Sequence, residues 1–173
     1  AMDFGWTDKF FAGLSGKTCQ CESRMYAVDG FAMHYYCGSA GTATEFTETD
    51  WYYLLMKALA MEELIEEHRR IMDKYDPKRK IGLICDEWGT WHPEEKGTTT
   101  RWLYQQNTMR DAVIAALTLN IFNQNADKII MANIAQTINV LQSVILTDGP
   151  KIILTPTFFV YELYAPHQDG MSY

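Results

Sequence analysis

Apolar residues gather along this chain in short continuous runs that alternate with longer segments of helical periodicity. The runs at residues 29–36, 80–86 and 127–132 are apolar, and each has the length of a strand. A continuous apolar run is typical of a parallel strand that is covered on both faces. We therefore predict three parallel strands at these positions.

Two long amphipathic segments separate these runs and predict helices. The first follows Thr49 or Asp50, either of which can cap it, and it ends before Pro77 because the residue before a proline disfavours helical geometry. The second occupies residues 101–123. The other predicted segments are a helix at 6–14, loops at 38–49 and 88–100, mixed helix and turn at 133–146, a short strand at 152–154, and a helix at 155–164.

The order strand, helix, strand, helix, strand, helix predicts an α/β fold. Long crossovers between continuous apolar runs are the pattern of a parallel sheet with covering helices. A chain of 173 residues has the size of one domain, and no repeat, low-complexity tract or linker divides it.

Composition and charge narrow the classes of partner. The net charge is −7 and the longest basic run is Lys78-Arg79-Lys80, which argues against nucleic acid as a partner. No apolar run reaches the roughly 18 residues that a membrane span needs, so we expect no membrane partner. Aromatic residues make up 13% of the chain. Such rings can stack on sugars, although they more often build the core.

The chain has four cysteines, at positions 19, 21, 37 and 85. Cys19 and Cys21 are too close for an ordinary mutual disulfide, and no second pair completes a zinc site. We therefore expect reduced thiols, no metal, no cofactor and a cytoplasmic location. Secretion is the alternative, because the start Ala1-Met2 does not resemble a natural N-terminus.

Polar side chains follow each predicted strand at the point where it ends. In a (β/α)₈ barrel, catalytic residues sit at the carboxyl ends of the strands. Taken singly, each of these groups is more typical of a satisfied core residue or a solvated loop. Their convergence on one sheet edge indicates an active site. The groups are His34 and Tyr36 on the first strand, Asp86, Glu87 and Trp88 on the second, and Asn133 and Gln136 on the third.

The chemistry of a retaining glycosidase fits this set. It needs an ionised carboxylate as nucleophile and a second carboxyl group about 5–5.5 Å away as acid/base. Donors such as His, Tyr and Gln can hold the nucleophile in place. Glu87 is the candidate nucleophile, and Trp91 is a candidate apolar wall for the sugar.

Several long motifs, in the right order, resemble the α-L-arabinofuranosidases of glycoside hydrolase family 51. The similarity extends from about Asp29 to the C-terminus and is faint before it. The matching runs lie at residues 34–36, 86–91, 103–108, 110–112, 119–122, 131–136, 139–142 and 154–157.

The resemblance implies a role for each candidate residue. Glu87 would form the arabinofuranosyl-enzyme intermediate, His34 and Tyr36 would hydrogen-bond near it, Trp91 would line the arabinose pocket, and Gln136 would bind a sugar hydroxyl. Family members remove terminal arabinofuranosyl residues from arabinan, arabinoxylan and their oligosaccharides, and they need no metal.

One departure from the family pattern concerns the acid/base. That residue is a Glu in a Gly-Asn-Glu motif on an earlier strand, and no such motif occurs here; Glu45 and Glu48 lie in the wrong place for it. A whole barrel takes about 250 residues. The resemblance therefore implies that residues 1–173 form the C-terminal part of a (β/α)₈ TIM barrel, strands six to eight, ending where a β-sandwich would continue.

The same resemblance implies partners. Family members often assemble into hexamers, so we expect a homo-oligomer of the full-length enzyme, or a complementary chain that supplies the rest of the barrel. The expected substrate is an arabinose-containing oligosaccharide or polysaccharide.

Two other functions stay open. A chain without the acid/base and with two open sheet edges could be an inactive fragment or an assembly or binding body. Another retaining barrel glycosidase, such as a xylanase or an endoglucanase, also carries a nucleophile Glu on strand seven. Asn107 and the run at 132–136 favour the furanosidase.

Overall fold

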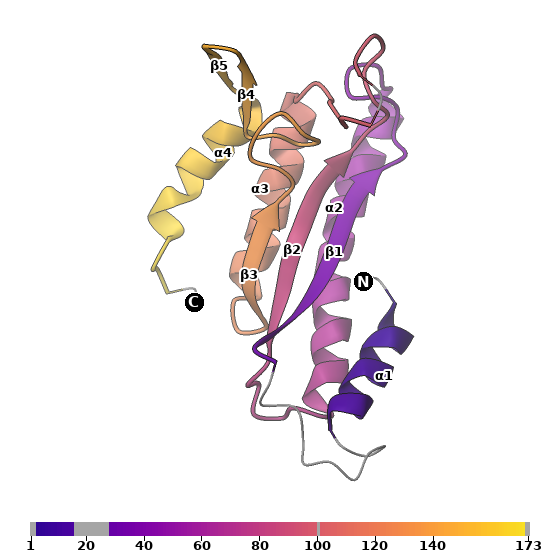
Figure 1. The fold of residues 1–173 in the computed structure, drawn as a ribbon, viewed down its shortest axis with the longest axis vertical. Helices are drawn as coiled ribbons and strands as arrows, with labels where there is room; N and C mark the ends of the chain where they lie inside the picture. Colours follow the sequence, from indigo (N-terminus) through magenta and orange to yellow (C-terminus); the bar gives the residue numbers. More distant parts are fainter. Residues whose placement is uncertain (1–2, 16–27, 100, 172–173) are drawn as a thin grey trace.

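The computed structural model describes residues 3–15, 28–99 and 101–171. The sheet has three parallel strands in the order β1-β2-β3, which confirms the predicted α/β class with a parallel sheet. The expectations for residues 17–27, including Cys19 and Cys21, lie outside the described residues. The elements in chain order are α1 (Phe4–Leu14), β1 (Gly30–Gly38), α2 (Glu48–Asp73), β2 (Gly82–Trp91), α3 (Met109–Gln124), β3 (Ile129–Ile134), β4 (Ile145–Asp148), β5 (Lys151–Leu154), α4 (Pro156–Tyr164) and the 3₁₀ turn η2 (Ala165–His167) (Figure 1).

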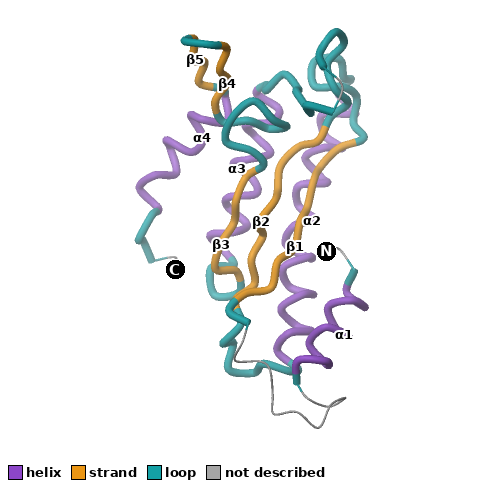
Figure 2. Tube along the Cα trace, viewed as in Figure 1, coloured by secondary structure: helices purple, strands orange, loops and turns teal. Residues whose placement is uncertain are grey.

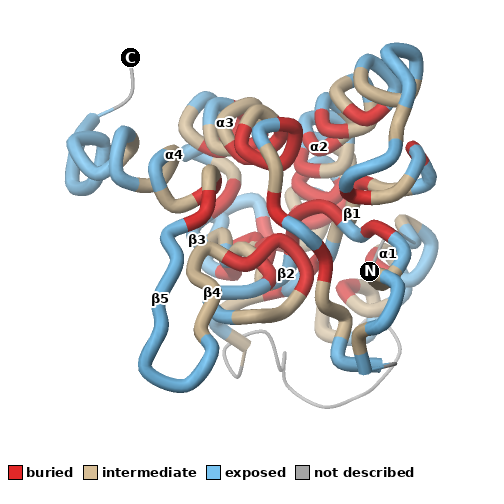
Figure 3. Tube along the Cα trace, turned by 90° about the horizontal axis from the view of Figure 1, so that it is seen from above, coloured by how far each residue is buried: buried red, intermediate tan, exposed pale blue. Residues whose placement is uncertain are grey.

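Helices α2 and α3 cover one face of the sheet (Figures 1 and 2). The buried residues gather between these helices and the strands (Figure 3). α1 packs against α2, where the Thr7 hydroxyl lies 3.0 Å from Nδ1 of the buried His68. Burial of this apolar layer supplies most of the stability of such a two-layer arrangement. The core residues include Met33, Met61, Ile65, Leu83, Trp88, Ala115 and Phe122.

The other face of the sheet carries small residues beside large ones. A side-chain carbon on Gly30 would overlap Ile84, and one on Gly82 would overlap Ile130, so each isoleucine lies across a glycine of the neighbouring strand. No described segment covers this face, and Ile130 is 65% exposed. The prediction that both faces of these strands are covered is therefore wrong for the described part of the chain.

A β-hairpin and a short helix follow the sheet. β4 and β5 pair antiparallel, and this hairpin is separate from the three-stranded sheet. α4 begins at Pro156 after Thr155, as predicted from Thr as cap and Pro at the first helical position. α4 lies beside α3, and the Tyr164 hydroxyl donates to the Ala116 carbonyl at 3.0 Å.

Two predicted boundaries around β2 and α3 are wrong. β2 continues to Trp91 instead of giving way to a loop at Trp88, because its ladder with β1 runs as far as Gly38↔Trp91. α3 begins at Met109, eight residues later than predicted. Thr108 and Asp111 form a capping box there, with the Thr108 N–H donating to Asp111 Oδ2 at 2.7 Å.

Smaller corrections concern α2 and the segment after β3. The cap of α2 is Thr47, and Asp50 completes its capping box from the third helical position. The described residues from Ala135 to Val144 contain no helix, although one was predicted there in part; they form turns. Backbone bonds from Val144 N–H to the Gln136 carbonyl and from Ile145 N–H to the Thr137 carbonyl hold them in that form.

Candidate active site

The site contains a β-bulge in β2 that could not be predicted from the sequence. Met33 pairs with Cys85 and His34 with Glu87, so β2 has one more residue than β1 at this point. The same extra residue appears against β3, where Ala132 pairs with Cys85 and Ile134 with Trp88. A β-bulge of this kind changes the direction of side chains and is frequent near active sites. Asp86 and Glu87 are thereby both left accessible, while Trp88 returns to the core.

Glu87 accepts a hydrogen bond from the neighbouring strand. The Tyr36 hydroxyl of β1 donates to Glu87 Oε2 at 2.7 Å. Burial, followed by this hydrogen bond, raises the pKa of Tyr36, so its hydroxyl keeps the proton that it donates. The Glu87 side chain remains 48% exposed, which leaves its carboxylate accessible to a ligand.

His34 lies between the two carboxylates. Its Nε2 is 2.8 Å from Asp86 Oδ1 and its Nδ1 is 3.6 Å from Glu87 Oε2. Asp86 Oδ1 has no hydrogen-bond partner among the described residues, so its contact with His34 is a close polar approach rather than a formed hydrogen bond. The imidazole therefore separates Asp86 from Glu87 on the open side of the sheet.

Trp91 completes this side of the site at the end of β2. Its ring meets that of Tyr36 edge to face, with centroids 5.1 Å apart, and the residue is 43% exposed. Gly38 permits this approach, because a side-chain carbon there would collide with the Trp91 carbonyl. The structure thus brings together four of the predicted site residues: Glu87, His34, Tyr36 and Trp91.

Gln136 lies on the same edge and makes no hydrogen bond to this cluster. The Ala135 N–H donates to the Trp88 carbonyl at 2.8 Å, which places Gln136 one residue beyond the point where β3 ends its contact with β2. Its side chain is exposed and makes no hydrogen bond with another described residue. The Asn133 side chain is also exposed, and its amide contacts the Met131 sulfur at 3.6 Å.

A buried polar network, which was not predicted from the sequence, supports the end of β2 through Thr90. The Thr90 hydroxyl donates to Asp111 Oδ1 at 2.6 Å, and the Thr90 N–H donates to Gln142 Oε1 at 2.8 Å. Gln142 Nε2 donates onward to the Asp111 carbonyl at 2.6 Å, and His92 Nε2 lies 3.2 Å from Asp111 Oδ1. Four polar residues form this network, and the sequence carries no local pattern that links them. It fixes the strand that carries Glu87.

The cluster offers two carboxylates, an imidazole and a phenol hydroxyl. Within the described ranges, no group of three or more His, Cys, Asp or Glu residues could hold a metal ion. Cys85, beside the carboxylates, is buried, and burial raises the pKa of its thiol to about 12. No helix in the described part of the chain is both long and apolar enough to cross a membrane.

Comparison with known proteins identifies the family. A family model described as the alpha-L-arabinofuranosidase C-terminal domain matches residues 86–173, which is more than half of the chain. The crystal structure of the GH51 arabinofuranosidase from Xanthomonas axonopodis pv. citri superposes with a TM-score of 0.88 at 44% identity. This chain belongs to the family 51 α-L-arabinofuranosidases. The resemblance predicted from its motifs is thus confirmed.

One further relative supports the family assignment, and one further crystal structure shares the fold. It is 45% identical, over 97% of its length, to an enzyme of Bacteroides ovatus named intracellular exo-alpha-L-arabinofuranosidase. The arabinose complex of an alpha-L-arabinofuranosidase from Thermotoga maritima shares the fold, with a TM-score of 0.73 at 22% identity, over 95% of this chain and 30% of that one.

The family 51 chain spans about a third of these relatives. It covers 32% of the Bacteroides ovatus enzyme, and 98% of it superposes on 33% of the Xanthomonas one.

Proposed function

We propose that this chain carries the nucleophile of a retaining exo-α-L-arabinofuranosidase that removes terminal arabinofuranosyl residues from arabinan- or arabinoxylan-type glycans. The observation that carries the proposal is the accessible Glu87 carboxylate at a strand end, with Tyr36 donating to it at 2.7 Å. Membership in family 51 supports the choice of sugar, and the name of the Bacteroides ovatus relative supports an exo mode and an intracellular location.

In the proposed mechanism Glu87 acts by covalent catalysis. One carboxylate oxygen attacks the anomeric carbon, the bond to the leaving oxygen breaks, and an acid/base group protonates that oxygen. Water deprotonated by the same acid/base then attacks the anomeric carbon and releases arabinose and the free carboxylate. Tyr36 orients Glu87, His34 keeps Asp86 from it, Trp91 forms one wall of the sugar site, and Gln136 binds a sugar hydroxyl.

The acid/base in this proposal comes from outside the residues of this chain. We propose that residues 1–173 form the C-terminal part of a (β/α)₈ barrel, with β1, β2 and β3 as strands six to eight. The small and large residues that interlock on the uncovered sheet face support this, because barrel interiors are filled in such layers. The remaining strands belong to another segment or chain, and the complete enzyme would assemble as a homo-oligomer.

The test is Glu87→Gln in the full-length protein, assayed on an aryl α-L-arabinofuranoside. Removal of a nucleophile should lower kcat on the order of 10⁴-fold or more. Glu66→Gln is the matched control, because Glu66 is exposed on α2, away from the strand ends, and should leave activity unchanged. Full activity of Glu87→Gln would refute the assignment.

Two alternative functions can be tested in the same way. Faster turnover of an aryl xyloside than of the arabinofuranoside by the wild type would identify another retaining barrel glycosidase. The uncovered sheet face and free edges also fit the second alternative, in which this chain is an inactive fragment or an assembly or binding body that lacks the acid/base. A folded, inactive monomer of the 173-residue chain in size-exclusion chromatography would favour that alternative, and an active complex of the chain with the rest of the barrel would favour the furanosidase.

A further inference from the structure

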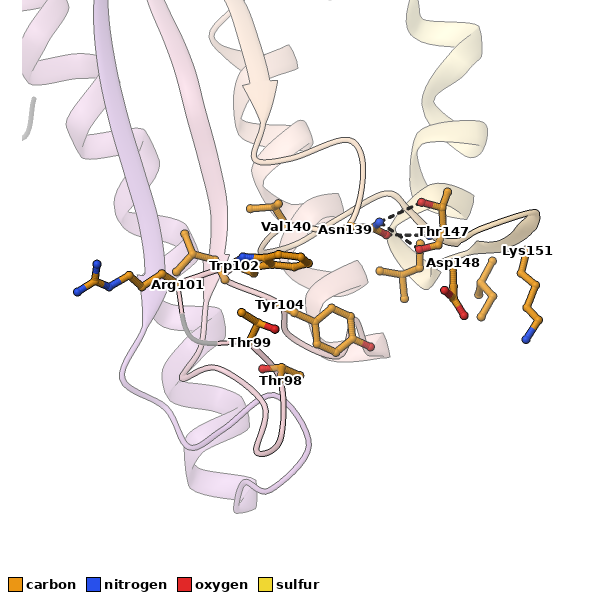
Figure 4. A pocket seen from close by; sticks show the side chains of 13 residues that line it. Thr98, Thr99, Arg101, Trp102, Tyr104, Asn139, Val140, Thr147, Asp148 and Lys151 are labelled. Carbon is orange, nitrogen blue, oxygen red and sulfur yellow. Dashed lines mark hydrogen bonds between the residues drawn. The ribbon is translucent and has the colours of Figure 1, made fainter.

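A cavity lies beyond the carboxyl end of the sheet, apart from the Glu87 cluster. It has a volume of about 810 Å³ and opens between residues 98–99 and 101–104, the segment 139–140 and the β4–β5 hairpin. Figure 4 shows Trp102 and Tyr104 on one side, with Asp148 and Lys151 across from them on the hairpin. Binding pockets for small ligands have volumes of this order.

Its walls are held together by hydrogen bonds. The Leu141 N–H donates to the Leu103 carbonyl at 2.8 Å and joins the two loops. Asn139 ties the second loop to the hairpin: its Nδ2 donates to the Thr147 carbonyl at 3.1 Å and its Oδ1 accepts from the Thr147 N–H at 2.7 Å. The cavity is therefore bounded by segments that fix one another.

The backbone of the lining is unusual. Arg101, Leu103 and Asn139 have positive φ values of 74°, 56° and 60°. Left-handed geometry costs a residue with a side chain on the order of 1–2 kcal/mol, and such residues cluster where function requires a shape. The neighbouring bonds of Leu103 and Asn139 hold this shape in place.

The lining combines aromatic rings with polar groups, as sugar binding requires. Trp102 is 72% exposed, the largest exposed fraction of any described tryptophan, although its neighbours Leu103 and Tyr104 are partly buried. An exposed indole can stack on the C–H face of a sugar ring. Thr98, Asp148 and Lys151 supply hydroxyl, carboxylate and ammonium groups for sugar hydroxyls.

Both walls continue from segments that carry proposed sugar-binding residues. Trp91 ends β2, and the chain from it leads to Trp102. Gln136 lies on the loop that contributes Asn139 and Val140, and its N–H donates to the Val140 carbonyl at 3.2 Å. The segments that flank the Glu87 cluster therefore lead directly into the walls of the cavity.

We propose that this cavity binds the leaving part of the substrate, a neutral pentose oligosaccharide beyond the bond that is cleaved, with Trp102 as its stacking platform. The proposal rests on the proposed function. It adds that the enzyme recognises more of the glycan than the terminal arabinose, and that residues 101–104 and the β4–β5 hairpin make this selection.

The test compares two substrates in the full-length protein, α-1,5-linked arabinotetraose and an aryl α-L-arabinofuranoside. Trp102→Ala should raise KM for arabinotetraose about tenfold, since a stacking contact of this kind contributes about one order of magnitude in affinity. Its kcat, and its kinetics on the aryl substrate, should stay within about twofold of wild type, because the reacting groups are untouched. Lys151→Ala, on the opposite wall, should act in the same direction.

Tyr52→Ala is the matched control, an exposed aromatic residue of α2 that does not line the cavity and should change neither substrate. An unchanged KM for arabinotetraose in both cavity variants would overturn the inference, as would a changed sedimentation mass of Trp102→Ala with unchanged kinetics, which would indicate a protein interface. Failure of the wild type on both substrates would instead refute the proposed function.

Discussion

At the scale of single residues, the bulge in β2 decides what Glu87 can do. An extra residue relative to both neighbouring strands leaves Asp86 and Glu87 accessible together. His34 occupies the space against Asp86, and Tyr36 donates to Glu87. Two adjacent carboxylates thus have different partners, which supports the proposal that only Glu87 acts as the nucleophile.

Tyr36→Phe tests the orienting role of the hydroxyl. The ring and its contact with Trp91 remain, but Glu87 loses its 2.7 Å donor. Hydrogen bonds to charged groups contribute about 1.5–3 kcal/mol, so kcat/KM on an aryl arabinofuranoside should fall roughly 10- to 150-fold. Steady-state kinetics of the full-length variant give this ratio.

Tyr35→Phe is the matched control for that measurement. Its hydroxyl donates at 2.6 Å to the Lys57 carbonyl of α2, on the side of the sheet that the helices cover. It should lose some stability and keep its kcat/KM. Equal kinetic losses in the two variants would show that the Tyr36 effect is structural.

The sequence predicts the site residues better than their geometry. Continuous apolar runs locate three strand ends, and parallel strands bring those ends to one edge, as the structure confirms for His34, Tyr36 and Glu87. The bulge could not be predicted, because Cys85-Asp86-Glu87 fits either phase of a strand. Only pairing with β1 and β3 shows which residue is extra.

At the scale of elements, one buried network joins the end of β2 to the start of α3. Asp111 is fully buried, accepts from the Thr90 hydroxyl and the Thr108 N–H, and lies beside His92. The same network reaches the loop after β3 through Gln142. The end of β2, the strand that carries Glu87, is therefore hydrogen-bonded through this network to α3 and to the loop after β3.

Asp111→Ala should lower the free energy of unfolding by about 3–5 kcal/mol. The change removes a helix cap and leaves buried polar partners without their acceptor. Urea unfolding of the full-length protein measures the loss. Glu67→Ala is the control, because its ion pair with Arg70 is on the surface and contributes little. A loss below 1 kcal/mol for Asp111→Ala would contradict the role of the network.

The start of α3 shows how element boundaries were missed. The predicted start at Arg101 is wrong because the Thr108–Asp111 capping box, which is present in the sequence, marks a later start. The left-handed backbone at Leu103 and the bridge between Tyr104 and Leu141 are accompanied by contacts with the loop after β3, where the Leu141 N–H donates to the Leu103 carbonyl. Those contacts lie about 40 residues away in the sequence, beyond what local periodicity can indicate.

At the scale of the whole molecule, helices cover only one face of the sheet within the described residues. One face of the sheet packs on α2 and α3, while Ile84 and Ile130 interlock with glycines on a face that no described segment covers. β1 and β3 each leave one edge unpaired within the described residues. Exposed apolar faces and free edges favour association with another polypeptide.

The 173-residue chain expressed alone should therefore self-associate. Light scattering after size exclusion should give a mass above the 19.9 kDa of one chain. Ile130→Lys should reduce this association, because a charge on the uncovered face opposes burial of that face. Met56→Lys is the matched control on α2, since both side chains are 65% exposed. A folded monomer would contradict the expectation.

The most direct test of the account is to identify the residue that forms the covalent intermediate. A 2-fluoro arabinofuranoside with a good leaving group should label the full-length enzyme, because the intermediate forms faster than it is hydrolysed. Peptide mass mapping should then locate one arabinosyl adduct on Glu87, in the Cys85–Trp91 segment. An adduct on another carboxylate, with Glu87 unmodified in an inactivated enzyme, would contradict the account.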